Sequence, residues 1–490
     1  MKKFFYLISS VALLASLSAC SDKNNGKIDF DDLVLDGFYV YGEATGTPDK
    51  VLSINSMAAG SNEVDKTVRA GMYEKYIYLE GGKEFSLIEN QAGVKTYYGA
   101  DLAEVNYGLG TEENPGKNFD NNPDMMILQG KLKIGEDAPA LKVAESGLYH
   151  IVLDNNQNGD LAQGAQIIIQ KADFGVRGGC NGWGFTAGTA VKNEDGTIVY
   201  TWENLEFSAK GEYKFASCNG WKINLDEDGV VKAEVGLGLT DGKLSNTGGN
   251  IVIGDKGGLY KITLTYTPKA GAVADSFSYA SELTQESTLP EECYLIGDAI
   301  AGWELPGNQV AMIPAHSEPG VFWAVRYISD ATKSFKFSQI STGWGKDFYS
   351  LGTDEGFTTA GGNCYVAEAG LYMIEVNYKE NIINVHSAEV YGCAEPFSNP
   401  NWGAVDEAKY TLNEDGTVSY VLKADGSHLR SFVKSAFDPE VANWWHREFT
   451  LGNDGKIAYR GAGGDSANTD GVVSGKTVTL DFNAGTGTIK

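Results

Sequence analysis

The sequence predicts an all-β protein made of four tandem antiparallel β-sandwich modules. Three observations support this fold class: a strand phrase recurs at domain-sized spacing, apolar and polar residues alternate within the repeats, and glycine is abundant. The chain of 490 residues has 61 glycines, 12 prolines and 42% hydrophobic residues. This composition is typical of a turn-rich protein with packed cores and not of a disordered chain, and no stretch shows a sustained helical period.

The N-terminus has the pattern of a bacterial lipoprotein signal. Two lysines precede an apolar run over residues 4–17, which is too short to span a bilayer and has the length of a signal-peptide core. The run continues into Leu-Ser-Ala-Cys at 17–20, which resembles a lipobox, where the cysteine thiol is acylated before cleavage. We therefore expect a signal peptide over 1–19 and, over 20–37, the acylated Cys20 with a polar tether. An ordinary signal peptide followed by a chance cysteine is the alternative.

A Gly-Leu-Tyr strand recurs along the chain. Copies begin at Gly147, Gly258 and Gly370, and a weaker copy begins at Gly475, so the spacing is 105 to 112 residues. Such a period corresponds to a domain and not to a solenoid repeat. Each unit also opens with a short strand that ends in glycine and has an alternating strand midway, such as Phe-Lys-Phe at 335–337. Alternation with period 2 between Gly, Asn and Asp turns predicts half-buried strands.

Module boundaries follow from the opening strands. They place the first to fourth modules at 38–172, 173–290, 291–388 and 389–490. The polar stretch 284–292 contains a proline, which predicts a short flexible joint between the second and third modules. The strand predicted for 382–386 runs almost directly into the fourth module, so we expect that joint to be stiff.

The nine tryptophans fall into two groups, and none lies in the first 182 residues. Three modules carry one tryptophan after the opening strand and another 38 to 42 residues later, in turns rich in Gly and Asn. These pairs are Trp183 with Trp221, Trp303 with Trp344, and Trp402 with Trp444 or its neighbour Trp445. Trp202 and Trp323 instead lie in alternating strands, with Tyr420 in the matching place of the fourth module, and are predicted to be core residues.

Paired loop tryptophans are typical of a carbohydrate-binding platform. The C–H face of a sugar ring stacks on an indole, and two indoles at an angle fit a curved oligosaccharide. Lys214 and Lys336 precede the second tryptophan by seven or eight residues on an alternating strand, where they point away from the core and can donate to hydroxyls. In the fourth module the aligned position is Val433, which leaves Lys434 and Arg430 as candidates. The alternative is that the tryptophans close loops over the ends of the sandwiches.

Taken together, these motifs resemble the SusE/SusF-type outer-membrane glycan-binding lipoproteins of gut Bacteroidetes. The lipobox, the Tyr-Leu-Ile-Gly-Asp…Gly-Trp opening at 294–303, the Phe-Lys-Phe strand and the Gly-Leu-Tyr strand carry the resemblance. It covers 173–490 well and 38–172 weakly. It implies three carbohydrate-binding modules that hold starch at the cell surface, each through an aromatic arc with a Lys or Arg. The first module, which lacks tryptophan, would be a spacer that does not bind.

The resemblance also implies location and partners. It predicts a lipid-anchored protein of the outer membrane, exposed at the cell surface, whose contact with the membrane is through the anchor alone. Other components of an outer-membrane glycan uptake system are expected partners. Acidic residues exceed basic ones by 65 to 39, for a net charge of −26, so the chain repels phosphates and no nucleic-acid partner is expected.

We expect neither a metal nor another cofactor. Five cysteines follow Cys20, an odd number without a CxxC pair, which argues against a zinc site and a full disulfide framework. They are Cys180, Cys218, Cys293, Cys364 and Cys393. Buried thiols are predicted, and a bridge between Cys180 and Cys218 stays open. The stretch 154–160 matches the first half of an EF-hand loop but lacks the glutamate at position 12, which favours a hairpin turn.

The sequence predicts a protein that is not an enzyme. It has no GxSxG or Cys–His signature. No acidic residue recurs beside the tryptophans, as the paired carboxylates of a glycosidase would. Two other classes remain as alternatives: a surface-anchored glycoside hydrolase, and an adhesin or scaffold whose tryptophans bind protein.

Overall fold

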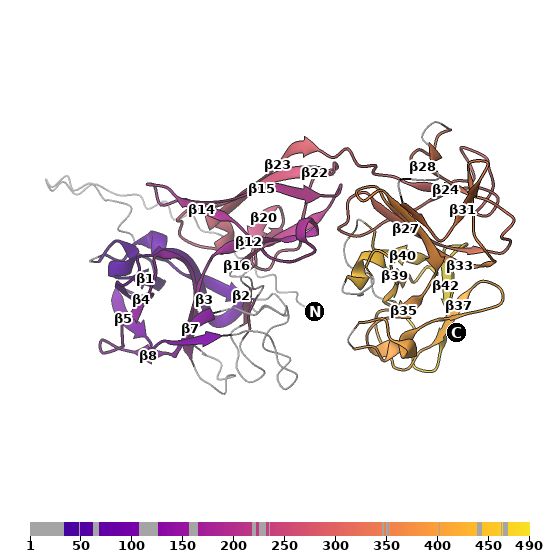
Figure 1. The fold of residues 1–490 in the computed structure, drawn as a ribbon. Helices are drawn as coiled ribbons and strands as arrows, with labels where there is room; N and C mark the ends of the chain where they lie inside the picture. The colour runs from indigo at the N-terminus through magenta and orange to yellow at the C-terminus, as the bar shows by residue number, and fades with distance from the viewer. Residues whose placement is uncertain are drawn as a thin grey trace, which may run out of the picture.

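The computed structural model confirms an all-β protein with many antiparallel sheets (Figure 1). It describes residues 34–48, 50–61, 68–106, 126–155, 165–217, 222–224, 232–234, 236–344, 347–348, 351, 353–400, 402–438, 443–461, 463 and 469–490. Within these ranges the one α-helix is α1 (Val273–Ser276), and no helix there is long and apolar enough to cross a membrane. The predicted signal peptide, Cys20, Cys218, Trp221 and most of the EF-hand-like stretch lie outside the described residues.

Two facing sheets form the first module. One sheet has the order β1-β4-β5-β8, with β9 also paired to β4: β1 (Gly37–Tyr41), β4 (Glu84–Gln91), β5 (Val94–Gly99), β8 (Lys133–Ile134) and β9 (Leu141–Lys142). The other has the order β2-β3-β10-β11-β7-β6: β2 (Ala58–Ser61), β3 (Val68–Leu79), β10 (Gly147–Asp154), β11 (Gln166–Lys171), β7 (Met126–Lys131) and β6 (Ala103–Asn106). Alternate residues of β10, such as Ile151 and Leu153, pack between the sheets against Phe85 and Leu87.

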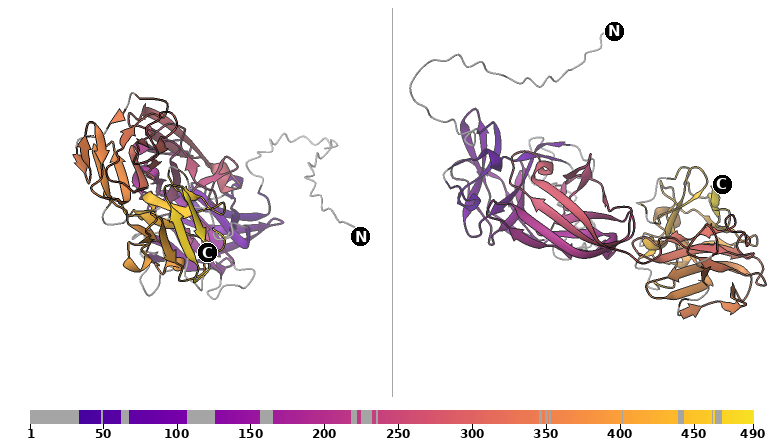
Figure 2. Two further views of the ribbon diagram at one scale, coloured as in Figure 1. Left: turned by 90° about the vertical axis from the view of Figure 1, so that its right-hand side faces the viewer. Right: turned by 90° about the horizontal axis from the view of Figure 1, so that it is seen from above.

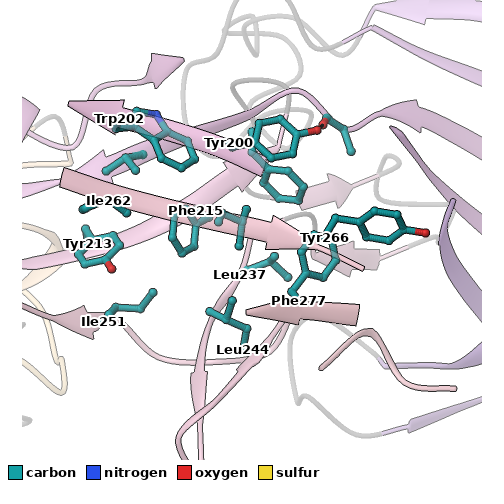
Figure 3. Close-up of a cluster of buried hydrophobic side chains, with 14 of the residues drawn as sticks. Tyr200, Trp202, Tyr213, Phe215, Leu237, Leu244, Ile251, Ile262, Tyr266 and Phe277 are labelled. Carbon is teal, nitrogen blue, oxygen red and sulfur yellow. Dashed lines mark hydrogen bonds between the residues drawn. The ribbon is translucent and has the colours of Figure 1, made fainter. Parts of the chain in front are cut away.

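The second module repeats this arrangement with two four-stranded sheets. The first is β13 (Thr186–Ala187), β12 (Phe174–Gly178), β16 (Glu212–Ser217) and β21 (Ile251–Val252). The second is β14 (Thr189–Lys192), β15 (Ile198–Phe207), β22 (Gly258–Tyr266) and β23 (Phe277–Glu286). Two hairpins are added: β17 (Lys222–Asn224) with β18 (Lys232–Glu234), and β19 (Gly238–Thr240) with β20 (Lys243–Ser245). Figure 3 shows the core between the sheets, where Trp202 lies beside Phe215 and Tyr200.

The third module contains the one parallel strand pair among the described strands. Its first sheet is β25 (Val310–Ala311), β24 (Tyr294–Ile296), β28 (Lys336–Ser338) and β29 (Asp347–Phe348). Its second is β26 (Ile313–Pro314), β27 (Val321–Ile328), β33 (Gly370–Asn377), β34 (Ile382–Ser387) and β30 (Thr353–Glu355), with β30 parallel to β34. The hairpin β31 (Thr358–Ala360) and β32 (Asn363–Tyr365) lies beside them.

Two four-stranded sheets also form the fourth module. They are β35 (Val390–Gly392), β38 (Ser431–Val433), β39 (Glu448–Leu451) and β40 (Ile457–Tyr459), and β36 (Thr411–Leu412), β37 (Val418–Val421), β41 (Thr477–Asp481) and β42 (Thr486–Ile489). Short 3-10 turns join strands throughout: η2 (Glu43–Thr45), η3 (Ser53–Asn55), η4 (Gly179–Asn181), η5 (Glu395–Phe397), η6 (Asp406–Ala408) and η7 (Trp444–Arg447). Tyr420 is buried in the core of this module, as predicted.

The recurring Gly-Leu-Tyr strand has a structural reason. Its tyrosine hydroxyl donates to the backbone carbonyl four residues earlier in three modules: Tyr149 to Glu145, Tyr260 to Lys256 and Tyr372 to Glu368, at 2.7 Å each. The ring packs beside the core while the hydroxyl fixes the turn that leads into the strand, as in the tyrosine corner of immunoglobulin-like sandwiches. The weaker fourth copy has no tyrosine.

The modules pack in two pairs, and Figure 2 shows these as two bodies joined by a narrow stretch between β23 and β24. In the first pair, Tyr76 and Leu148 of the first module belong to the core cluster of the second. The side chain of Asn246 donates to Glu74 at 2.8 Å, and Glu74 also pairs with His150 at 2.9 Å. The salt bridge from Lys379 to Glu206, at 2.7 Å, joins the two bodies.

The third and fourth modules share a core and form the C-terminal body. Trp323 is fully buried, as predicted for a core residue, but it packs edge-on against Tyr459 of the fourth module with ring centroids 5.4 Å apart. The outer face of β27 is therefore covered by the neighbouring module. The guanidinium of Arg326 donates to the backbone oxygens of Phe482 and Asn483, both at 3.1 Å, across the same interface.

A buried ionic network lies at the centre of this interface. Glu375 on β33 is fully buried and accepts hydrogen bonds from Ser435 Oγ at 2.6 Å and Ala436 N at 2.7 Å. Arg447 Nε lies 3.3 Å from the same carboxylate, and His386 Nε2 also lies 3.3 Å away. Burial opposes ionisation, but these partners together hold the pKa of Glu375 below its ordinary value. Burial likewise disfavours the His386 cation, but Glu375 raises the pKa of His386 above its ordinary value.

The Tyr372→Phe substitution should lower the free energy of unfolding of the C-terminal body. Loss of one hydrogen bond to a backbone carbonyl costs about 0.5–1.5 kcal/mol. Urea denaturation followed by circular dichroism measures this change. Tyr365→Phe in the same module is the control, because its hydroxyl has no hydrogen bond within the described residues. If both substitutions lowered the free energy of unfolding equally, the role assigned to the hydrogen bond of Tyr372 would be contradicted.

Stability of the C-terminal body should fall as pH rises above neutrality. A raised pKa means that His386 contributes fully below about pH 6.5, its unfolded pKa, and that this contribution is lost as pH rises through the folded pKa. Glu375, with a lowered pKa, contributes above about pH 4.3 and loses its effect as pH falls through its folded pKa.

Melting temperatures measured between pH 5 and 9 test this. The His386→Gln substitution should reduce the fall in melting temperature on the alkaline side of neutrality. His428→Gln is the control, because His428 bonds to Ser427 and, among the described residues, pairs with no carboxylate. If the melting temperature of the His386 variant fell with rising pH as steeply as that of the unsubstituted protein, His386 would not be the cause of the pH dependence.

Candidate functional site

The opening loop of the third module positions Trp303. Gly297 and Gly302 exchange backbone hydrogen bonds of 2.9 and 2.7 Å, which close a small loop immediately before the indole. Gly297 has a φ of 140°, and a Cβ there would lie 2.2 Å from the carbonyl oxygen of Ser334. Only glycine fits this close approach between β24 and the strand beside it.

The structure brings the predicted residues of the third module together. The ring centroids of Trp303 and Trp344 lie 6.3 Å apart, with their planes inclined by 28°. Trp344 is 49% exposed, a large fraction for an indole. Lys336 stands on β28 between Phe335 and Phe337, which are fully buried, so its side chain points outward as predicted. Its Nζ lies 6.0 Å from the Trp344 ring.

The fourth module also brings its tryptophans together. The buried amide of Asn399 donates to the backbone oxygens of Gly392 and Gly403, at 2.9 and 2.7 Å, and so fixes the loop around Trp402. The rings of Trp402 and Trp444 are 4.8 Å apart and inclined by 36°. This pair is tighter than the one in the third module.

Aromatic residues on the sheet support the tryptophan pair of the fourth module. Phe432 stacks on Tyr391 at 5.5 Å and lies 6.1 Å from Trp444. Strand pairing sets Gly392 opposite Ser431, as Gly178 is set opposite Tyr213, so Phe432 and not Val433 occupies the place of Lys214. The sequence alignment was therefore wrong by one residue here.

Arg430 supplies the cation of the fourth module. Its guanidinium carbon lies 5.0 Å from the Trp402 ring and 5.5 Å from the Trp444 ring. The buried carboxylate of Glu448 holds it through two bonds, of which Nη2–Oε2 measures 2.9 Å. Lys434, the other candidate, lies 3.5 Å from Glu389. The hydrogen bond from Lys409 lowers the pKa of Glu389, which keeps that carboxylate charged opposite Lys434.

Trp445 points to a different place from Trp444. Its ring lies 5.5 Å from that of His316 in the third module, and the guanidinium of Arg460 stands 5.6 Å from it. Arg460 also donates to Glu448 at 2.9 Å. Sequence reasoning missed Glu448 and Arg460. The signal was a lone acidic residue beside the apolar Phe449 and Leu451 in a strand, with arginines 18 residues before and 12 residues after it.

The candidate site of the second module is only partly within the described residues. Asn181 holds the loop, because its side chain bonds to Gly178 N, Val176 O and Thr186 Oγ1 at 2.8 to 3.0 Å. Trp183 follows with a φ of 61° and is half-buried. Lys214 on β16 alternates with fully buried neighbours and points outward. Because Trp221 lies outside the described residues, its pairing with Trp183 stays a prediction.

Metal-ligating clusters and disulfides are absent from the described parts of the chain. No group of three or more His, Cys, Asp or Glu residues there could hold a metal ion. Cys180, Cys293, Cys364 and Cys393 form no disulfide with one another. Burial raises the pKa of Cys180 and of Cys293 to about 12, so neither is a thiolate nucleophile at neutral pH.

Comparison with known proteins shows that two parts of the chain match a described protein family. Residues 292–384 and 389–488 each match the family described as SusF/SusE starch specific CBMs. A curated relative, the outer membrane protein SusF of Bacteroides thetaiotaomicron, is 30% identical over 237 residues, which cover 44% of this chain and 46% of that protein. The matched region thus spans about half the length of this relative.

A solved structure, that of SusF from Bacteroides thetaiotaomicron, aligns with 89% of this chain and 99% of the other, at 18% identity and a TM-score of 0.38. The resemblance expected from the sequence is confirmed: the third and fourth modules match the SusF/SusE family of starch specific CBMs.

Proposed function

We propose that this chain is a non-catalytic, lipid-anchored protein that holds polysaccharide, foremost starch, at the outer surface of the outer membrane. The observation that carries the proposal is the recurrence of one platform in two modules. Each has two tryptophans, one in the loop after the opening strand and one in the loop after the strand paired with it, and a cation within 6.0 Å of a ring. Tryptophans that only closed loops over the ends of the sandwiches would need neither the cation nor an indole that is 49% exposed.

Sugar chemistry fits these platforms. An indole offers a flat apolar surface for the C–H face of a pyranose, and a lysine or arginine beside it offers donors for the hydroxyls. Rings inclined by 28° and 36° suit a chain that curves, as an α-glucan does, better than a flat ribbon. Such sites need no steering by charge, which agrees with an uncharged ligand and a net charge of −26.

Several weak sites on one chain strengthen attachment. Once the first site is occupied, binding of the same polysaccharide at the second is intramolecular, so avidity exceeds the affinity of either site. We assign binding to the second, third and fourth modules through Trp183, Lys214, Trp221, Trp303, Lys336, Trp344, Trp402, Arg430 and Trp444. The first module would separate these sites from the membrane. The four module ranges are part of the same proposal.

Location follows from the N-terminus. The lipobox at 17–20 would attach Cys20 to lipid, and the matched relative is named an outer membrane protein. A protein in this position would deliver glycan to other components of an uptake system.

Trp344→Ala in the full chain should weaken retardation in native gels that contain amylopectin. Loss of a tryptophan anchor costs about 2 kcal/mol, or roughly 30-fold at that site, and less for the whole chain while the other sites remain. Adding Trp402→Ala should reduce retardation further. Leu412→Ala is the matched control, since Leu412 is 48% exposed. Retardation by xylan equal to that by amylopectin would contradict the choice of α-glucan, and unchanged retardation of the double variant would favour an adhesin or scaffold.

Incubation of the full chain with maltooligosaccharides should yield no shorter products. The proposal assigns the tryptophan sites to binding, without a pair of carboxylates for glycosidic cleavage. Chromatography of the sugars over many hours measures this, with an α-amylase as the positive control. Shortened products that vanish when the candidate platform is mutated would establish the glycoside hydrolase alternative.

A further inference from the structure

We infer that the platform of the fourth module is positioned by the third module, so that its glycan site is complete only when the two are docked. This rests on the proposed function and deepens it. The turn η7 consists of four consecutive residues between β38 and β39. The first residue, Trp444, belongs to the platform, whereas the next three face the third module.

The turn η7 is anchored on the third module by each of its last three residues. The ring of Trp445 packs on His316, and the backbone oxygen of His446 accepts a bond from His316 N at 3.0 Å. Arg447 is fully buried and pairs with both Glu375 and Glu318. Trp444 lies in the same 3-10 turn, which the bond from His446 N to Asn443 O closes at 2.9 Å, so anchoring of the last three residues restricts the position of Trp444.

The connection between β38 and β39 is bonded to Glu375 at its beginning as well as at its end. Ser435 and Ala436, directly after β38, both bond to Glu375. One side chain of the third module therefore holds both ends of the segment that carries Trp444. If the third module moved away, the segment would lose these bonds, and Arg447 would lose the carboxylates that compensate its burial.

The cation of the platform belongs to the same chain of contacts. Arg430 is fixed by Glu448, which follows η7 directly, and Glu448 also binds Arg460. Arg460 stands over Trp445, whose ring rests on His316. Both elements of the site, the indole and the guanidinium, are thus connected to the surface of the third module.

The platform of the third module provides an internal contrast. Lys336 lies on β28, and Trp303 follows β24, both in the sheet β25-β24-β28-β29. Glu375 lies on β33 in the other sheet. Loss of the interface should therefore weaken the fourth site and leave the third site intact. By linkage, glycan bound to the fourth module should in turn stabilise the interface.

The test uses the full chain in two backgrounds. In the first, Trp183→Ala, Trp303→Ala and Trp344→Ala leave the fourth site as the binding site. In the second, Trp402→Ala and Trp444→Ala remove it. Glu375→Gln, which keeps the shape of the side chain but removes its charge, should lower affinity for maltoheptaose about five- to tenfold or more in the first background. The second background keeps the sites of the second and third modules, and its affinity should change less than about twofold, since Glu375 lies in the sheet of the third module that does not carry Lys336. Lys379→Ala, which breaks the ion pair with Glu206, is the matched control and should change neither.

A second test measures amide hydrogen exchange of the first-background protein with and without maltoheptaose, and it needs no substitution at the interface. The amides of Ala436 and His316 donate across the interface, so maltoheptaose should slow their exchange. Unchanged exchange with ligand bound, or equal losses of affinity in both backgrounds, would overturn the inference. If the first background binds no maltoheptaose at all, the failure lies instead with the proposed function of the fourth platform.

Discussion

The carboxylate of Glu375 is the constraint on which the C-terminal body depends. A buried charge is unfavourable unless its partners are held in place, and here the partners come from the third and fourth modules together. Replacing one partner would leave another buried and unpaired, so the network favours one docking geometry over others. The surrounding apolar contacts, such as Trp323 with Tyr459, supply burial but little orientation.

In the N-terminal pair of modules, a buried carboxylate at the junction is likewise held by polar partners, but no arginine is among the partners named here. The sheet that contains β3 and β10 has two covered faces: one packs within its own module, and the other meets the second module. At that junction Glu74 accepts bonds from Asn246 and pairs with His150, while Tyr266 donates to the backbone oxygen of Tyr76 at 3.0 Å. Because the first module shares a core cluster with its neighbour, it is a stiff support, which suits the spacer role proposed for it between membrane and binding sites.

Local patterns in the sequence predicted much of this architecture. The Gly-Leu-Tyr phrase marks a strand with its own tyrosine hydrogen bond, and alternation around Lys214 and Lys336 set their outward direction correctly. The sequence could not reveal contacts between residues that are distant in the chain, within a module or between modules. The alternation of β27 does not show which residue meets Tyr459, and the cation of the fourth site depends on Glu448, 18 residues away. The register error at Val433 has the same origin, because pairing across strands decides which side chain faces outward.

The two platforms differ in a way that bears on how a polysaccharide would be held. The third module presents more widely spaced rings, with a lysine beside an exposed indole. The fourth presents closer rings, with an arginine clamped by Glu448 and therefore limited in its motion. Fixing the arginine in this way reduces the entropy that it loses when it bonds to a hydroxyl. Under the proposed function, the two sites would favour different local geometries of the glucan, because their rings differ in spacing and inclination. Together they would hold an irregular branched polymer better than two copies of either site.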